Sequence, residues 1–192
     1  MTGLELLMVM LAGVSLPRPE YNKMMKDLIV ALKANGPRIK PKVRLLYTGG
    51  HADNPEFFEL LQQNDAHVVS DNTGFGTRAA DVLICEDGDP LEAIINYYFE
   101  EKPAATRQMG TQVERMERLL DLVKQYKADG VVASRLYMCD LWAFEHFLMR
   151  KRLHENNVPF LELEVDYTPE GQGQIKTRVQ AFVESLADRQ TA

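Results

Sequence analysis

The chain has 192 residues, of which 45% are hydrophobic and 26% are charged, and its formal net charge at pH 7 is -6. This composition is typical of a soluble globular protein with one domain or two small ones. The acidic balance and the lack of a basic stripe argue against a nucleic-acid surface. Two cysteines are too few for a disulfide framework, which favours a reducing, cytoplasmic location.

The N-terminal run LELLMVMLAGV is apolar but carries Glu5, lacks a basic leader and is too short to span a bilayer. We therefore predict a packed helix and no membrane association. A second helix is expected to end near Ala34. We assign residues 1–40 to a helical segment that packs on the rest of the chain or on sequence upstream of it. Its apolar face predicts self-association, and hence a homo-oligomer.

Residues 41–192 show alternating strand and helix patterns. Strands are expected near 43–47, 66–70, 129–133 and 160–165, and helices near 55–64, 90–101, 111–127, 141–156 and 173–187. Such alternation predicts parallel strands joined by right-handed crossovers. The expected fold class is therefore α/β: a small four-stranded parallel sheet in a Rossmann-like or flavodoxin-like three-layer sandwich, with two extra N-terminal helices.

The stretch DGVVASRLYMCD, residues 129–140, ends a buried strand on a thiol, Cys139, just before a new helix. Ligands of open α/β sheets bind at the carboxyl ends of the strands, and helix N-termini stabilise thiolates and metal-bound sulfur. Most free cysteines are simply small buried apolar residues, so position alone leaves both readings open. Cys85 has no partner at metal-site spacing, and two cysteines cannot complete a tetrahedral sulfur site.

Two small-residue turns follow the first two expected strands. The turn with Gly49 and Gly50 would let a phosphate or thioester approach the backbone, although it lacks the Walker and dinucleotide patterns. The loop DNTGFGTR, residues 71–78, supplies polar groups and one arginine, Arg78. The alternative for this loop is ordinary turn chemistry.

The last strand carries Glu162, Glu164 and Asp166 at alternating positions, so their side chains share one side of the sheet. Burying such a row is costly, which predicts that this strand is an edge strand or lines a site. At the start of the following helix, spacing places three further candidates near the same end of the sheet: Gln174, Thr177 and Arg178. The four histidines show no paired spacing and no nucleophile elbow is present, which argues against a zinc enzyme or a serine hydrolase.

Taken together, the last third of the chain resembles a known family. Cys139-Asp140, the strand PFLELEVD and the helix GQIKTRVQAFVE resemble the C-terminal domain of the 2-hydroxyacyl-CoA dehydratase D-component family, which includes subunits of benzoyl-CoA reductase. The segments RLLYTGG, DNTGFGTR and DPLEAIINYYF are also similar to the family. The similarity covers essentially the whole chain, but only the C-terminal half of a full-length subunit.

The resemblance implies an enzyme in which two α/β domains enclose a 4Fe–4S cluster held by three cysteines. A sister subunit and an ATP-dependent activator then support radical dehydration of a 2-hydroxyacyl-CoA to an enoyl-CoA. By this resemblance Cys139 is the third cluster ligand. The candidate substrate-binding residues at this end of the sheet are Gly49, Gly50, Arg78, Gln174, Thr177 and Arg178.

The other two ligand cysteines of the family lie in an N-terminal domain that this sequence lacks, so we expect that the chain alone does not hold the usual cluster. A truncated chain, half of a split subunit and a stand-alone descendant all remain open. So do three functions: part of a 2-hydroxyacyl-CoA lyase, a benzoyl-CoA reductase-type domain, and a cluster-free acyl-CoA or subunit-binding domain. Retention of Cys139-Asp140 favours an enzyme part, and the acyl group stays undetermined.

Overall fold

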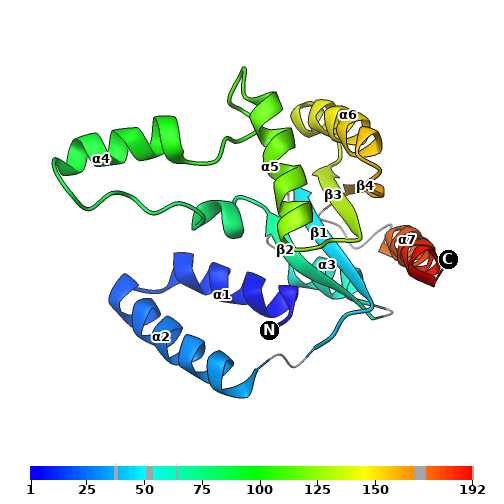
Figure 1. Ribbon diagram of the computed structural model, residues 1–192, viewed down its shortest axis with the longest axis horizontal. Helices are drawn as coiled ribbons and strands as arrows, with labels where there is room; N and C mark the ends of the chain where they lie inside the picture. Colours follow the sequence, from blue (N-terminus) through cyan, green and yellow to red (C-terminus); the bar gives the residue numbers. More distant parts are fainter. Residues whose placement is uncertain (37–38, 51–53, 64, 167–171, 192) are drawn as a thin grey trace.

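A four-stranded, all-parallel sheet forms the centre of the computed structural model, which describes residues 1–192 except 37–38, 51–53, 64, 167–171 and 192 (Figure 1). The strands are β1 (Val43–Gly49), β2 (Ala66–Asn72), β3 (Gly130–Leu136) and β4 (Phe160–Val165). Their order is β2-β1-β3-β4, so β2 and β4 are the edge strands. The predicted α/β fold class is confirmed.

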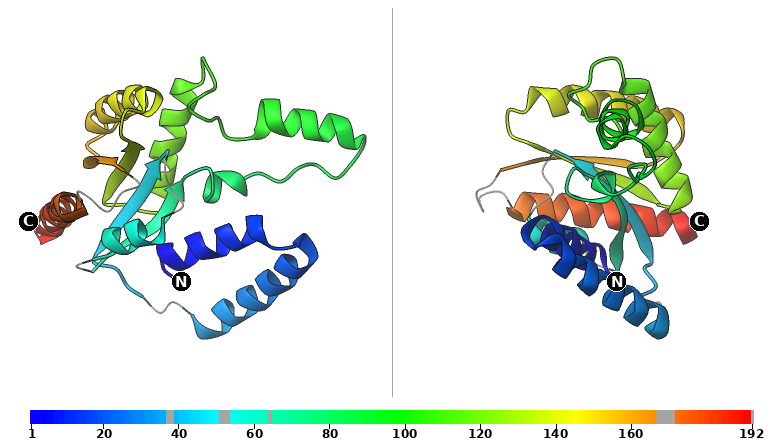
Figure 2. Two further views of the ribbon diagram at one scale, coloured as in Figure 1. Left: turned by 180° about the vertical axis from the view of Figure 1, so that it is seen from behind. Right: turned by 90° about the vertical axis from the view of Figure 1, so that its left-hand side faces the viewer.

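Helices cover both faces of the sheet. Residues of one strand alternate between the faces: Leu45 and Tyr47 belong to one hydrophobic cluster, and Leu46 between them belongs to the other. The first cluster is completed by α1 (Gly3–Ser15), α3 (Pro55–Leu61) and α7 (Gln172–Thr191). The second is completed by α5 (Gln112–Gln125) and α6 (Asp140–Glu155). The result is the predicted three-layer sandwich (Figure 2).

Helix α1 lies beside edge strand β2. Thr2 and Glu5 form a capping box that starts the helix, with each side chain accepting the backbone N–H of the other residue at 3.0 and 2.7 Å. Gly3 then approaches the strand so closely that a Cβ there would lie 2.6 Å from the carbonyl oxygen of Val68. Helix α2 (Arg18–Asn35) packs on α1 and buries none of its described residues. Helix α1 thus contacts the sheet, and α2 contacts α1.

The segment between β2 and α5 leaves the body of the protein (Figure 1). It contains a short 3-10 helix, η1 (Thr77–Ala79), then α4 (Pro90–Asn96), which continues as a π-helical turn, η2 (Tyr97–Glu101). The expected 90–101 helix is thus present, with a change of helical type near its end. Apolar side chains of this segment are exposed, among them Leu83, Leu91, Tyr98 and Phe99. In the described part of the chain, no helix has both the length and the apolar character needed to cross a membrane.

Candidate functional site

Cys139 lies where the sequence predicts it, past the carboxyl end of β3 and at the N-cap of α6. A tight turn brings it there: Met138 has a left-handed backbone (φ 60°), and the Cys139 amide donates to the carbonyl of Leu136 at 3.1 Å. The first turn of α6 then forms as Ala143 donates to the Cys139 carbonyl at 2.9 Å. The thiol side chain is half-buried against the cluster that contains Trp142. This is the positive end of the α6 dipole.

The surface around this thiol is apolar and open. Large apolar side chains of the turn and of α6 are exposed here, namely Tyr137, Met138, Leu141, Phe144 and Phe147. Contiguous exposed apolar side chains of this kind mark surfaces that another polypeptide or a ligand covers. Cys139 lies among them and is itself half-buried.

The glycine turn after β1 adjoins the same region. An added Cβ on Gly49 (φ 154°) would lie 2.4 Å from the carbonyl oxygen of Ser134 on β3. A Cβ on Gly50 would lie 2.4 Å from Nε1 of Trp142, three residues beyond Cys139. Both glycines are therefore required for packing of β1 against β3 and α6. Their role in ligand binding stays a prediction.

The loop after β2 is organised by Asp71. Its carboxylate accepts hydrogen bonds from the Thr73 amide at 3.0 Å, the Thr73 hydroxyl at 2.7 Å and the Thr77 amide at 3.2 Å. A Cβ on Gly76 would lie 1.8 Å from the same carboxylate oxygen, so glycine is needed there. Burial raises the pKa of Asp71, while the hydrogen bonds from Thr73 and Thr77 and the charge of Arg78 act to lower it. Turn chemistry thus explains most of the DNTGFGTR motif.

Arg78 has a different environment. Burial, followed by the nearby charge of Arg118, lowers the pKa of its guanidinium, and Asp71 opposes that shift. Within the described part of the chain it makes no hydrogen bond or ion pair. A half-buried cation of this kind, at the carboxyl end of β2, is suited to an anionic group of a ligand.

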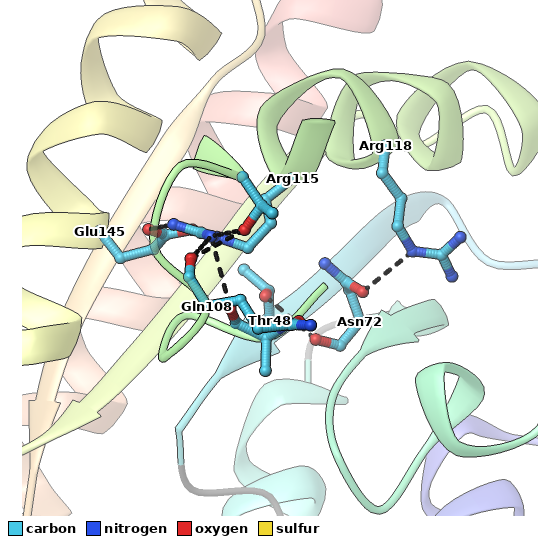
Figure 3. A network of polar contacts seen from close by, with 8 residues as sticks. Thr48, Asn72, Gln108, Arg115, Arg118 and Glu145 are labelled. Carbon is cyan, nitrogen blue, oxygen red and sulfur yellow. Dashed lines mark hydrogen bonds and ion pairs between the residues drawn. The ribbon is translucent and has the colours of Figure 1, made fainter. Parts of the chain in front are cut away.

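A buried polar network lies between the end of β2 and helices α5 and α6 (Figure 3). Arg115 and Glu145 form a two-pronged ion pair with both bonds at 2.8 Å, and the two side chains are nearly inaccessible. Arg115 also donates to the Thr111 hydroxyl and to the Gln108 carbonyl. On the next turn of α5, Arg118 contacts the side chain of Asn72 at 3.5 Å. Sequence reasoning missed this network, because its members lie on separate elements with no shared spacing.

No described hydrogen bond or ion pair links the three candidates on α7 to Cys139 or to the glycine turn. Arg178 donates to the Glu162 carbonyl of edge strand β4 at 2.7 Å. Thr177 donates to the Gly173 carbonyl one turn earlier at 3.0 Å, and Gln174 is exposed. Helical spacing correctly placed these residues at the start of α7, but it does not predict which group the long Arg178 side chain contacts.

The acidic row lies on an edge strand, as predicted, and neighbouring cations neutralise it. Glu164 pairs with Arg135 at 3.1 Å, and Glu162 pairs with Arg150. Beneath Glu162 lies His146, fully buried, with its Nδ1 3.4 Å from Oε1 of Glu162. Burial lowers the pKa of His146, although Glu162 acts to raise it. His146 continues the apolar stripe of α6 at four-residue spacing from Trp142, a signal that sequence reasoning did not use.

Among the described residues, no group of three or more His, Cys, Asp or Glu side chains is placed to hold a metal ion. Cys85 is exposed on the projecting segment, with its sulfur 3.7 Å from the Asp87 carbonyl. The described residues therefore do not form a complete site for an iron–sulfur cluster. They offer one thiol at the carboxyl ends of the strands, Cys139.

Residues 1–186 match the family described as 2-hydroxyglutaryl-CoA dehydratase, D-component. The chain belongs to this family. It is 29% identical over 79% of its length to YjiM of Escherichia coli, which carries the name of a dehydratase subunit. It is 24% identical over 93% of its length to the (R)-phenyllactyl-CoA dehydratase beta subunit of Clostridium sporogenes, and 21% identical over 95% to a benzoyl-CoA reductase subunit of Thauera aromatica. These matches span only 39%, 47% and 48% of the respective relatives.

Proposed function

We propose that this chain acts as part of a 2-hydroxyacyl-CoA dehydratase, a lyase that works as a complex with a sister subunit. The observation that carries the proposal is the position of Cys139. Within a chain of this family, the thiol lies past β3 at the start of α6, half-buried and surrounded by exposed apolar side chains. Strand ends of this kind are where open α/β sheets bind their ligands.

The thiol of Cys139 would then be one ligand of a 4Fe–4S cluster whose remaining ligands come from a partner polypeptide. Such a cluster supplies one-electron chemistry when bound, and an ATP-dependent activator would deliver the electron. The chain's own contribution is positional. The φ 60° turn at Met138 and the α6 N-terminus hold the sulfur at the surface, where exposed apolar neighbours exclude water once a partner covers them.

For the acyl-CoA, the glycine turn and Arg78 are the best supported of the candidate residues. Gly50 lies against Trp142 and hence beside the thiol turn, and Arg78 offers a guanidinium with no described hydrogen bond at the neighbouring strand end. Gln174 is free to contact a ligand, whereas Thr177 and Arg178 already donate to backbone carbonyls. We therefore assign substrate contacts to Gly49, Gly50, Arg78 and Gln174, and a structural role to the other two.

A second candidate is a benzoyl-CoA reductase-type subunit, favoured by the similarity to the Thauera aromatica protein over 95% of the chain. The two candidates share the cluster and the thioester and differ in the acyl group and in the reaction, which is elimination of water in one and reduction in the other. A third, a cluster-free acyl-CoA or subunit-binding domain, would use the same surfaces without iron.

Anaerobic reconstitution tests the role of the thiol. The chain is co-expressed with the N-terminal domain of a subunit of this family, where the resemblance places the other two ligand cysteines, and iron and acid-labile sulfide are measured per complex for wild type, Cys139→Ser and the control Cys85→Ser. We expect iron in wild type and in the control, and its loss with Cys139→Ser, because a hydroxyl is a poor ligand for iron–sulfur clusters. Equal iron in Cys139→Ser would contradict the ligand role. Turnover of hydroxyacyl-CoA against benzoyl-CoA then decides between the two enzymes.

A further inference from the structure

Strand β4 leaves one edge of the sheet open, and this edge does not involve the Cys139 thiol. Val131 of β3 and Tyr137, the residue just after β3, donate to the carbonyls of Pro159 and Val165, so the odd-numbered residues from 159 to 165 turn their backbone groups toward β3. In a parallel ladder the residues between them turn outward. These are Phe160, Glu162 and Glu164. In the part of the chain that the structure describes, no strand lies beside these backbone groups, because β4 is the last strand of the sheet.

A groove of about 570 Å³ lies along the first half of this edge, up to Glu162. Phe160, Leu161 and Glu162 of the strand line it, with apolar Val158 and Pro159 at the near end. Its walls come from the C-terminal half of α6 and from α7, which lie on opposite faces of the sheet (Figure 1). The shape is that of a sheet with one strand position free.

Charge indicates what would occupy this position. Four basic side chains line the groove, namely Arg150, His154, Arg178 and Arg189, against a single carboxylate, Glu162. Arg150 already pairs with that carboxylate. Within the described part of the chain, Arg178 and Arg189 make no ion pair, and Arg178 donates only to the outward Glu162 carbonyl. The groove is therefore basic in a chain whose net charge is -6.

We propose that the β4 edge binds an extended, carboxylate-bearing segment of a partner protein as a fifth strand. Main-chain hydrogen bonds to the outward groups of Phe160, Glu162 and Glu164 provide the ladder, and alternate carboxylates of the segment, all on the α7 side of the sheet, reach Arg178 and Arg189. An incoming amide takes over the Glu162 carbonyl, and Arg178 is released to bind a carboxylate. The exchange leaves no polar group of the edge unpaired.

Fluorescence anisotropy with synthetic peptides tests this proposal. The probe is a fluorescein-labelled hexapeptide of alternating Glu and Val. Its controls are the Lys-Val version and a Glu-Val version with alternate amides N-methylated. We expect binding of the probe alone: the lysine peptide meets like charge, and N-methylation removes the ladder donors while keeping the carboxylates. Equal binding of the N-methylated peptide would overturn strand addition, and no binding of the probe would overturn the site.

Variants of the chain locate the binding. Arg189→Gln removes a cation that makes no described hydrogen bond or ion pair, so it tests the charge of the groove without disturbing the fold. Arg178→Gln tests whether the Arg178 guanidinium, once released from the Glu162 carbonyl, binds a carboxylate of the peptide. Each is expected to weaken binding about tenfold, the size of one charge-assisted hydrogen bond, whereas Arg107→Gln on the projecting segment should have no effect. Unchanged affinity in Arg189→Gln would contradict the proposal. A concentration-dependent dimer that blocks binding of the probe, measured by light scattering, would also contradict it, because the occupant of the groove would then be a second copy of this chain.

Discussion

At the β2 edge, α1 lies against the strand, and the loop that follows is held by the carboxylate of Asp71. At the β4 edge, no strand in the described part of the chain pairs with the outward backbone groups; the Arg178 side chain of α7 reaches one of them, the Glu162 carbonyl, and a basic groove takes the place of a neighbouring strand. Both strands end the same sheet, yet the polar groups of one are used within the chain and those of the other face outward. Exposed sheet edges invite pairing with other chains, so an edge left open and basic has a role outside the fold.

The polar groups beside β2 extend into a buried ion pair, and this pair should give the largest stability effect. Arg115→Met leaves the Glu145 carboxylate buried without its partner (Figure 3). We expect the free energy of unfolding to fall by about 3–5 kcal/mol, as measured by urea titration.

The matched control is the double variant Arg115→Met with Glu145→Leu. Removing both charges leaves no unpaired ion, so most of the loss should be recovered, apart from the bonds of Arg115 to Thr111 and Gln108. A double variant as unstable as the single one would mean that the loop anchors, and not the charge, make Arg115 important.

The Asp71 loop provides a smaller and more local effect. In Gly76→Ala the new methyl group would overlap the Asp71 carboxylate, which must move away from its three donors. We expect a loss of about 2–3 kcal/mol in unfolding free energy, since a buried carboxylate loses hydrogen bonds. Gly74→Ala, two residues earlier, meets only the far end of the Arg78 side chain at 3.3 Å and should cost less than about 1 kcal/mol. Similar losses in the two variants would argue against Asp71 as the centre of the loop.

The order and type of the elements followed from the sequence because strand and helix periods alternate clearly along it. The strands extend further than the apolar runs predict. Thr48 and Ser134, one residue beyond the predicted strands, are polar, yet each is fully buried within the sheet. Ladder hydrogen bonds with neighbouring strands continue through such residues, and hydrophobic periodicity cannot detect that pairing.

The site was predictable where it depends on chain direction and not where it depends on contacts across the fold. A thiol just beyond a buried strand must lie at the carboxyl end of a parallel sheet, which placed Cys139. Arg115 and Glu145 are 30 residues apart on different helices, so only packing brings them together. Arg178 reaches back along the strand to the Glu162 carbonyl, away from the glycine turn with which it was grouped.

The last and smallest effect belongs to the β4 side, where a buried group lacks the partners that Asp71 has. His146 is fully buried between Trp142 and Phe160, and Glu162, Arg135 and Arg150 are the charged groups that face it. Burial lowers its pKa in the folded state, so the unfolded chain binds a proton more readily. Stability from this residue is therefore complete above the ordinary histidine pKa of about 6.5 and is lost as pH falls below it.

His146→Phe tests the direction of this pH dependence, because phenylalanine places an aromatic ring without a titrating group in the same space. Urea unfolding of both proteins at pH 7.5 and pH 5 should show wild type losing more stability than the variant, at most about 1.4 kcal/mol per pH unit for one proton. Carboxylates that do not contact His146 contribute equally to both proteins, so the difference isolates the His146–Glu162 pair. If the two proteins lose the same stability on acidification, His146 is protonated in the fold, with Glu162 as its counter-ion at 3.4 Å. The β4 side would then be as fully partnered as the β2 side.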